Sequence, residues 1–200
     1  VDGIVGLNIA TRADCLPPDV VAYLADLAER TDLTVELGLQ SSSDVTAERI
    51  HRGHTWAQFL DGYNRLRAAS GKIAVCVHLI FGLPGEDDET MLQTVRDVAA
   101  LRPEQVKLHL LHVLRKTELE KQWRAGFYQP LEEPHYIRLL ASALELLPPE
   151  TVICRLTGDG SRDDLLAPLW SLRKTAVIND LDKLLYRESR WQGRLYEVGE

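Results

Sequence analysis

The chain has 200 residues, of which 45% are apolar and 26% are charged, a composition typical of a single globular domain with a sizeable core. Its 23 basic and 30 acidic residues give a net charge of −7, which argues against a general binder of nucleic-acid backbones. No apolar run reaches the roughly 18 residues of a membrane span, and no basic leader precedes the first apolar residues. We therefore expect a cytoplasmic protein without membrane contacts.

Five segments have the apolar and polar alternation of strands, and helical patterns separate them. The predicted strands are residues 4–12, 34–41, 73–82, 105–114 and 151–159. The predicted helices begin at residue 17 and then span residues 43–52, 55–69, 89–101, 119–125, 133–147 and 165–186. Such repeats predict an α/β fold, a partial (β/α) TIM-like barrel with parallel strands and outer helices. Residues 1–186 would form this core and residues 187–200 a charged C-terminal tail.

Each predicted strand has one apolar and one polar face, because side chains alternate across a strand. The apolar face is expected to pack under the helices and carries Val5, Leu7, Ile9, Val35, Leu37, Leu39, Val75, Val77, Leu79, Phe81, Val106, Leu108, Leu110, Val152 and Leu156. The polar face carries Asn8, Arg12, Glu36, Gln40, His78, Lys107, His109, Arg155, Thr157 and Asp159.

Polar groups repeated on five strands are costly to bury without partners. They indicate a polar cavity that binds a ligand, although a network of mutually satisfied groups would leave the same pattern. Glu36 has both interpretations, as a general base or as a structural ion pair with Arg12. Gln40, Gly82 and Asp159 stand near the C-terminal ends of their strands, where parallel sheets bind ligands.

Six ordered blocks of sequence carry a family resemblance. They are VELGLQSS, RIHRGH from Arg49, HLIFGLPGE from His78, KLHLLHVL, RLTGD and LLAPLWS. With these blocks the chain resembles the YhcC-like branch of the radical S-adenosylmethionine enzymes, which is related to coproporphyrinogen dehydrogenases and Elongator-type catalytic subunits. The resemblance implies an enzyme whose S-adenosylmethionine and 4Fe–4S cluster sit at the C-terminal strand ends. The cluster reduces the sulfonium, and the resulting 5′-deoxyadenosyl radical abstracts hydrogen from a substrate.

The same resemblance implies partners and cofactor contacts. The electron donor would be a flavodoxin or a ferredoxin, and the unknown substrate a small molecule or tRNA. Gln40 falls where relatives hold the ribose hydroxyls, and Arg52 falls near the methionine carboxylate. His78 replaces an acidic ribose contact, while Ile80 and Gly82 match the strand that packs on adenine.

Further cofactor contacts are implied on two other strands. The backbone of Leu111, His112 and Val113 would read the adenine edge, and Asn8 and Arg12 would face the methionine part. The resemblance assigns no catalytic residue. The candidates for substrate contact are the remaining inward polar groups, Glu36, His109, Arg155, Thr157 and Asp159.

The cysteines depart from the family pattern. A 4Fe–4S cluster needs closely spaced thiolates, but Cys15, Cys76 and Cys154 are scattered along the chain. We therefore expect that the segment binding the cluster lies outside this chain, which would be inactive alone. The histidines and cysteines form no convincing ligand set, so no metal site is predicted on the chain itself.

Two other functions stay open. The chain could hold an adenosyl ligand or tRNA without redox chemistry, as a binding module. It could also be an aldolase-like barrel fragment acting on a phosphorylated sugar, for which Lys107 is the only inward lysine. We rank the radical enzyme first because the polar face and the six blocks favour it together.

Overall fold

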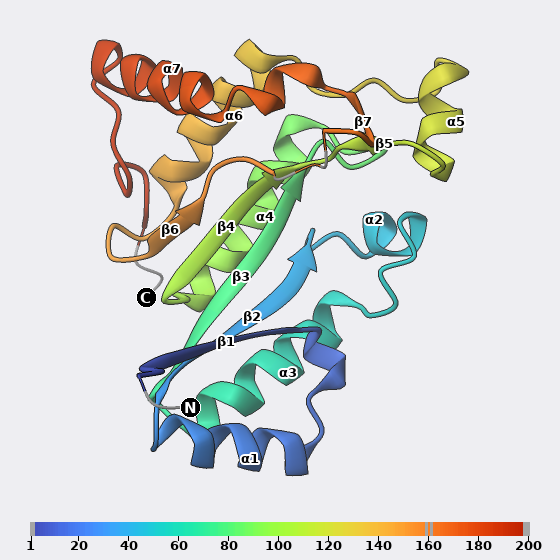
Figure 1. The fold of residues 1–200 in the computed structure, drawn as a ribbon. Coiled ribbons are helices and arrows are strands. Elements are labelled where there is room, and N and C mark those ends of the chain that lie inside the picture. Colours follow the sequence, from blue (N-terminus) through green and yellow to red (C-terminus); the bar gives the residue numbers. More distant parts are fainter. Residues whose placement is uncertain (1–2, 159, 161, 198–200) are drawn as a thin grey trace.

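A five-stranded parallel sheet forms the centre of the computed structural model, which describes residues 3–158, 160 and 162–197. Its strands follow the order β1–β2–β3–β4–β6 (Figure 1). Their bounds are β1 Gly6–Thr11, β2 Asp32–Gln40, β3 Ile73–Phe81, β4 Gln105–Leu110 and β6 Val152–Arg155. The parallel α/β sheet and its five strands are thus confirmed, and the barrel is partial.

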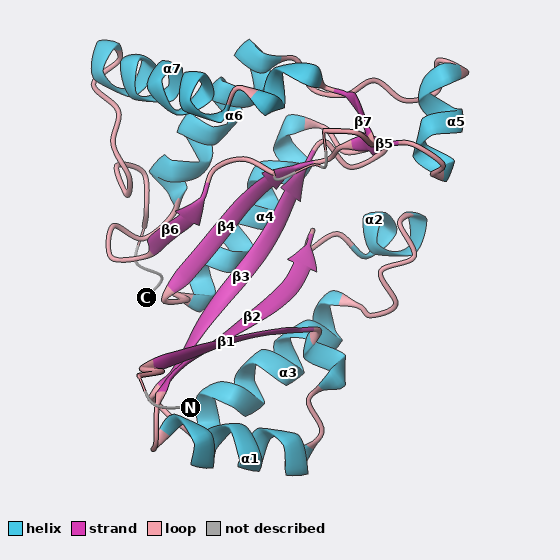
Figure 2. Cartoon of the chain, viewed as in Figure 1, coloured by secondary structure: helices cyan, strands magenta, loops and turns pink. Residues whose placement is uncertain are grey.

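Helices cover one face of this sheet and leave the other face open (Figure 2). The covering helices are α1 Pro18–Ala28, α3 Trp56–Ala69, α4 Asp88–Leu101 and α6 Glu133–Leu146. Around them lie α2 Asp44–Arg49, α5 Glu118–Arg124, α7 Lys174–Arg187 and the 3₁₀ turns η1 Ala13–Cys15 and η2 Leu169–Leu172. Within the described part of the chain, no helix has the length and apolar character needed to cross a membrane. We call the open face of the sheet the inner face.

Side-chain caps explain why three of the helices begin where they do. Ser43 accepts a hydrogen bond from Thr46 N at the start of α2, and Asp87 accepts one from Thr90 N at the start of α4. Thr55 begins α3 with a capping box that it shares with Gln58. These caps fix the strand-to-helix turns beside the C-terminal edge of the sheet.

The apolar face is buried in the central strands but not at the edges. The apolar side chains of β2 and β3 that face the helices are 0–2% exposed. Val5 and Leu7, however, are 80% and 41% exposed, and Val152 is 57% exposed. The prediction that these three residues pack under the helices is wrong. Val152 is the register partner of Gln105 and so lies on the inner face, while the next residue, Ile153, packs against the core. Val5 precedes β1, and Leu7 lies on β1, an edge strand.

Three predicted elements have different bounds in the structure. The strand expected at residues 151–159 is shorter and ends at Arg155. The strand expected at residues 105–114 leaves the sheet after Leu110, and Val113–Leu114 forms a separate strand, β5. The helix expected at residues 165–186 is shorter, because Leu165–Ala167 forms a strand, β7, which pairs antiparallel with β5. Pro168 follows β7, and α7 begins only at Lys174. Pairing between distant segments therefore overrides the local helical pattern.

The charged tail is held against α6 as far as it is described. Arg190 and Arg194 both bond to Glu145 on α6, whose side chain is 3% exposed. Gln192 Nε2 donates to the carbonyl oxygens of Pro148 and Thr151, at 2.7 Å each. The tail is charged as predicted, but its charges are mostly partnered rather than solvated. The division of the chain at residue 187 stays a prediction.

Candidate functional site

A carboxylate held by two basic side chains lies at the centre of the inner face. Glu36 on β2 accepts a hydrogen bond from Lys107 Nζ on β4 at 2.6 Å. The same oxygen lies 2.8 Å from Nε2 of His78 on β3, an approach too bent for a hydrogen bond. The side chains of Glu36, Lys107 and His78 are 12%, 17% and 23% exposed. Glu36 is therefore ion-paired with Lys107, and Arg12, the partner considered from the sequence, pairs elsewhere.

His109 extends this polar row toward the C-terminal end of β4. Its ring centroid lies 5.6 Å from that of His78, with the two rings tilted by 32°. Nε2 of His109 is buried and has no hydrogen-bond partner within the described residues, whereas Nε2 of His78 is in contact with the Glu36 carboxylate. A buried polar atom left without a partner costs about 1–3 kcal/mol, so such atoms mark places that a ligand or water completes.

The histidines of this row are neutral at pH 7. Burial, followed by the charges of His78, Arg155 and Lys107, lowers the pKa of His109 to about 4. Burial and then the charge of Lys107 also lower the pKa of His78. Burial opposes ionisation of Glu36, but the hydrogen bond and charge of Lys107, with the charge of His78, outweigh it and lower the pKa of the carboxyl. The inner face thus combines an ionised pair with uncharged imidazoles.

His112 lies where the chain leaves β4. The amide of Leu111 still donates to the carbonyl oxygen of Phe81, at 2.9 Å, before the chain turns away. A Cβ atom on Gly158 would come within 2.7 Å of the His112 ring, so only glycine fits against it. Nε2 of His112 is another buried atom without a partner in the described residues. The predicted backbone contact of residues 111–113 with adenine stays a prediction.

The C-terminal ends of β2 and β3 have an irregular backbone. Gln40 ends β2 with a left-handed φ of 66°, and its amide folds back over Gly38. Ile80 lies half-buried on the inner face, opposite His109 in the β3–β4 register. Gly82 follows β3 with a φ of 81°, a conformation that favours glycine. An amide, an apolar side chain and a left-handed glycine therefore lie at the same edge of the sheet.

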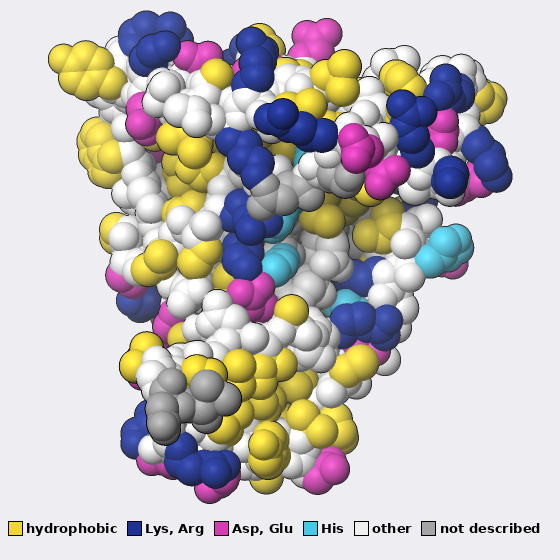
Figure 3. Space-filling view, viewed as in Figure 1, with side chains coloured by type: hydrophobic (Ala, Val, Ile, Leu, Met, Phe, Trp, Pro, Cys, Tyr) yellow, Lys and Arg dark blue, Asp and Glu magenta, His cyan; other side chains and the backbone are white. Residues whose placement is uncertain are grey.

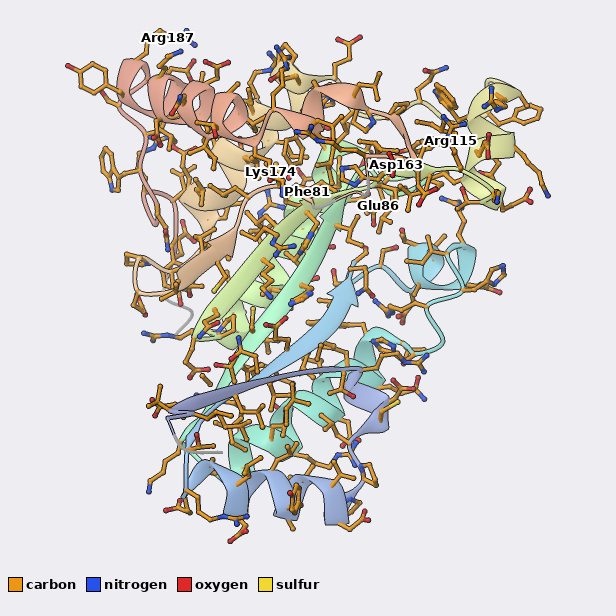
Figure 4. All side chains as sticks on the ribbon, in the orientation of Figure 1. Phe81, Glu86, Arg115, Asp163, Lys174 and Arg187 are labelled. Carbon is orange, nitrogen blue, oxygen red and sulfur yellow. The ribbon has the colours of Figure 1, made fainter. Side chains whose placement is uncertain are left out.

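The turn after β3 is tied to its surroundings by polar contacts. Glu86 accepts a hydrogen bond from Ser41 Oγ at 2.5 Å, which joins this turn to the end of β2. Burial raises the pKa of Glu86 despite this bond. The Tyr128 hydroxyl donates to the carbonyl oxygen of Gly82 at 2.9 Å. Figure 4 labels Phe81 and Glu86 at this end of the sheet, with Lys174 close by in the view.

Arg52 lies beneath the end of β2, with its side chain only 2% exposed. Its guanidinium donates to the backbone carbonyl oxygens of Leu39, Ser41 and His54. These bonds use most of the donors, and Nη2 has no hydrogen-bond partner in the described residues but lies 3.7 Å from Oδ1 of Asp44. Arg52 therefore fixes the strand end, and its contact with a methionine carboxylate stays a prediction that rests on this one nitrogen.

Asn8 and Arg12 belong to the exposed edge of the sheet. Both residues are exposed, and Arg12 Nε donates to Asp14 at 2.9 Å. The Arg12 guanidinium also lies against Gly53, where a Cβ atom would be 3.2 Å from it. No hydrogen bond joins Arg12 to the Glu36 pair among the residues described. The predicted contact of Asn8 and Arg12 with the methionine part of the cofactor is not tested by these positions and stays a prediction.

The remaining predicted substrate residues come from β6 and the segment after it. Arg155 is the register partner of Lys107, and its charge acts on both His78 and His109. Thr157 is 5% exposed. Asp159 lies outside the described residues. The structure therefore brings Arg155 to the histidine pair and leaves Thr157 largely enclosed.

Lys107 is the residue of this row that the sequence analysis did not place in the site. It lies two residues before His109 on the same face of β4, so the alternation that selected His109 also points to it. Figure 3 shows histidine side chains at the floor of a hollow in the inner face, with Lys and Arg side chains along its border.

The cysteines do not fit a 4Fe–4S cluster in the part of the chain described. Cys76 is buried, and burial raises its pKa to about 12, which disfavours a thiolate. Cys15 and Cys154 are exposed, on η1 and β6. Across the described ranges, no group of three or more His, Cys, Asp or Glu side chains could hold a metal ion. The ends of β2 and β3, in contrast, offer the amide, apolar and backbone groups that suit a nucleoside.

Comparison with known proteins matches almost the whole chain to one superfamily. Residues 2–98 match the model described as Radical SAM superfamily, and residues 103–187 match the Radical_SAM C-terminal domain. The chain is 43% identical to YtqA of Bacillus subtilis over 98% of its own length and 61% of YtqA. It is 36% identical to YhcC of Escherichia coli over 91% of its own length and 59% of YhcC.

A solved structure has the same fold. The archaeal Methanocaldococcus infernus Elp3 with an N-terminal deletion superimposes with a TM-score of 0.80 and 21% identity, over 94% of this chain and 43% of that one. The chain spans about three fifths of the length of the two curated relatives.

Proposed function

Because the chain belongs to the radical SAM superfamily, in the branch that includes YhcC, we propose that it forms the S-adenosylmethionine-binding part of a radical SAM enzyme. The nucleoside would lie at the C-terminal ends of β2, β3 and β4. The observation that carries this proposal is the conjunction there of the left-handed Gln40, whose amide folds back over Gly38, and the half-buried Ile80.

Each of these residues has a physical role in the proposed site. The Gln40 amide can donate to one ribose hydroxyl and accept from the other. Ile80 offers an apolar surface for the adenine ring, and the left-handed turn at Gly82 ends the strand beside it. Arg52 holds the end of β2 in place through its three carbonyl contacts, which keeps Gln40 in position.

The 4Fe–4S cluster would be held by residues outside those described here, since the described cysteines do not fit it. When bound, the cluster supplies the electron that cleaves S-adenosylmethionine. The inner face, with the Glu36 and Lys107 pair and the two histidines, would then orient the substrate beside the nucleoside. The substrate itself, a small molecule or tRNA, remains to be identified.

The test measures binding and turnover separately. Calorimetry with S-adenosylmethionine should give saturable binding to the protein, and Gln40→Ala should weaken it about tenfold, as expected for a lost hydrogen bond. Gln93→Ala, at an exposed position on α4, is the matched control and should bind like the parent. Anaerobic reconstitution of the parent protein with its upstream segment should give iron–sulfur absorbance and 5′-deoxyadenosine. Absence of both binding and product would reject the proposal.

A further inference from the structure

The half-buried carboxylate of Glu86 lies at the edge of the sheet where the nucleoside would bind, outside the contacts assigned to the ligand (Figure 4). We propose that Glu86 is a positioning residue of this site. Through the hydroxyl of Ser41 it holds the end of β2, and so keeps the amide of Gln40 in the place from which it would bind the ribose hydroxyls. This inference deepens the proposed function and rests on it.

The first observation is that Gln40 has a backbone conformation that it does not adopt easily by itself. Its φ of 66° lies in the left-handed region, which is unfavourable for a residue with a side chain. The pairing of β2 with β3 also shifts its register between Gly38 and Gln40. Such conformations persist where the surrounding structure holds them. The residues next to Gln40 must therefore be fixed for its amide to stay in place.

The second observation is that Ser41, the next residue, is fixed through its side chain. Its hydroxyl donates to Oε1 of Glu86 at 2.5 Å and accepts from the amide of Ser43 at 3.1 Å. The hydroxyl oxygen of Thr94 lies further away, at 3.3 Å. A hydroxyl has one hydrogen to donate, and a carboxylate is its strongest acceptor. Because Ser41 is only 1% exposed, water does not take the place of the carboxylate.

The third observation is that Glu86 is anchored independently of this bond. Its amide donates to the carbonyl oxygen of Leu83 at 3.1 Å, within the turn after β3. Arg49, at the end of α2, crosses the same turn and donates to the carbonyl oxygen of Pro84 at 2.7 Å. A Cβ atom at Gly85 would collide with the Arg49 guanidinium, so glycine is needed where the arginine crosses. The carboxylate therefore links the end of β2 to a turn that is already fixed.

Arg52 has a different task at the same strand end. Its guanidinium donates to the carbonyl oxygens of Leu39 and Ser41, which holds the backbone on both sides of Gln40. Glu86 holds the side chain of Ser41 instead. Since Arg52 keeps the strand end folded, loss of Glu86 should change the orientation of Gln40 rather than unfold the sheet. The expected result is a selective loss of ribose recognition.

Two probes separate ribose recognition from general binding. Adenosine has both ribose hydroxyls, and 2′,3′-dideoxyadenosine has neither, so calorimetry should show that the parent protein prefers adenosine. Glu86→Ala should weaken adenosine binding about fivefold and leave dideoxyadenosine binding unchanged, because the second ligand offers Gln40 no hydroxyl. Glu86→Gln keeps an oxygen that accepts from Ser41 and should restore most of the adenosine affinity. A merely structural role would weaken both ligands alike.

The matched control is Glu89→Ala, at a side chain on α4 that is 71% exposed, and it should bind both nucleosides like the parent. If Glu86→Ala fails to fold, Ser41→Ala removes the other half of the same hydrogen bond and should cause the same selective loss. Equal weakening of both nucleosides, or of neither, in these variants overturns the inference and leaves the proposed function standing. A parent protein that binds neither nucleoside, or does not distinguish them, instead rejects the nucleoside site of the proposed function and this inference with it.

Discussion

A buried glutamate and a partly buried one lie in contrasting surroundings on opposite sides of the sheet. Glu145 on α6 accepts from Arg190 through one oxygen and from Arg194 through the other, and its side chain is 3% exposed. Glu36 on the inner face is approached by Lys107 and His78 through a single oxygen. Both oxygens of the Glu145 carboxylate accept hydrogen bonds from the tail. Glu36, in contrast, lies in the same row as His109, whose Nε2 has no hydrogen-bond partner in the described residues.

The difference separates a structural ion cluster from a binding site. Both sites disfavour protonation of the carboxylate, since basic partners overcome the effect of burial and lower the pKa of Glu36 and Glu145 alike. Charge alone therefore does not distinguish them. The buried Nε2 atom of His109, which has no hydrogen-bond partner in the described residues, does, because a purely structural cluster gains nothing from leaving it unpaired.

The largest expected effect is at the structural cluster. Glu145→Gln should lower the free energy of unfolding by about 3 kcal/mol, because it leaves the guanidinium of Arg190, 14% exposed, with only the more distant carboxylate of Glu188 at 3.4 Å. Urea denaturation measures this loss. Glu118→Gln, which removes a 69% exposed partner of Lys121, is the matched control and should cause no measurable change. Equal stability of the Glu145→Gln and Glu118→Gln variants would contradict the structural role of Glu145.

A smaller loss of stability is expected at the inner face. Glu36→Gln should lower the free energy of unfolding by about 1 kcal/mol, since Lys107 and His78 are partly exposed and can be hydrated in its absence. The same denaturation assay measures it. A loss as large as that of Glu145→Gln would show that Glu36 is also a structural anchor, and the contrast between the two sites would fail.

The pH dependence of stability provides a third test. His109 has a pKa of about 4 when folded, below its value of 6.5 in the unfolded chain. Below pH 6.5 the unfolded chain therefore binds a proton that the folded chain does not, and stability falls as the pH drops from 6.5 toward 4. His109→Gln should make this fall shallower in denaturation curves recorded across that window. Parallel curves for the variant and the parent would place the titration elsewhere.

Local pattern was enough to predict the central strands. The alternation from Val75 to Phe81 gave the correct strand, the correct inward position of His78 and the turn at Gly82, because each of these depends on neighbours in sequence. The start of α3 was readable for the same reason, since the Thr55 cap lies within four residues of its partner Gln58.

Contacts between distant segments could not be read in this way. The ion pair of Glu36 joins residues 71 apart, and only the parallel order of β2, β3 and β4 reveals Lys107 as its partner. The exposure of Val5 depends on the absence of a second strand neighbour for β1 in the described sheet. The hydrogen bond from Arg52 to the carbonyl oxygen of Leu39 depends on how the chain folds back beneath the end of β2.

The two hydrogen bonds of Gln192 connect the C-terminal tail to the inner face of the sheet. They fasten the turn from Pro148 to Thr151, and β6 departs from that turn one residue later. The strand that carries Arg155, β6, is short and has one strand neighbour, so these two hydrogen bonds help to hold it in the sheet. An affinity tag that displaces Gln192 from this turn would therefore disturb the inner face through β6.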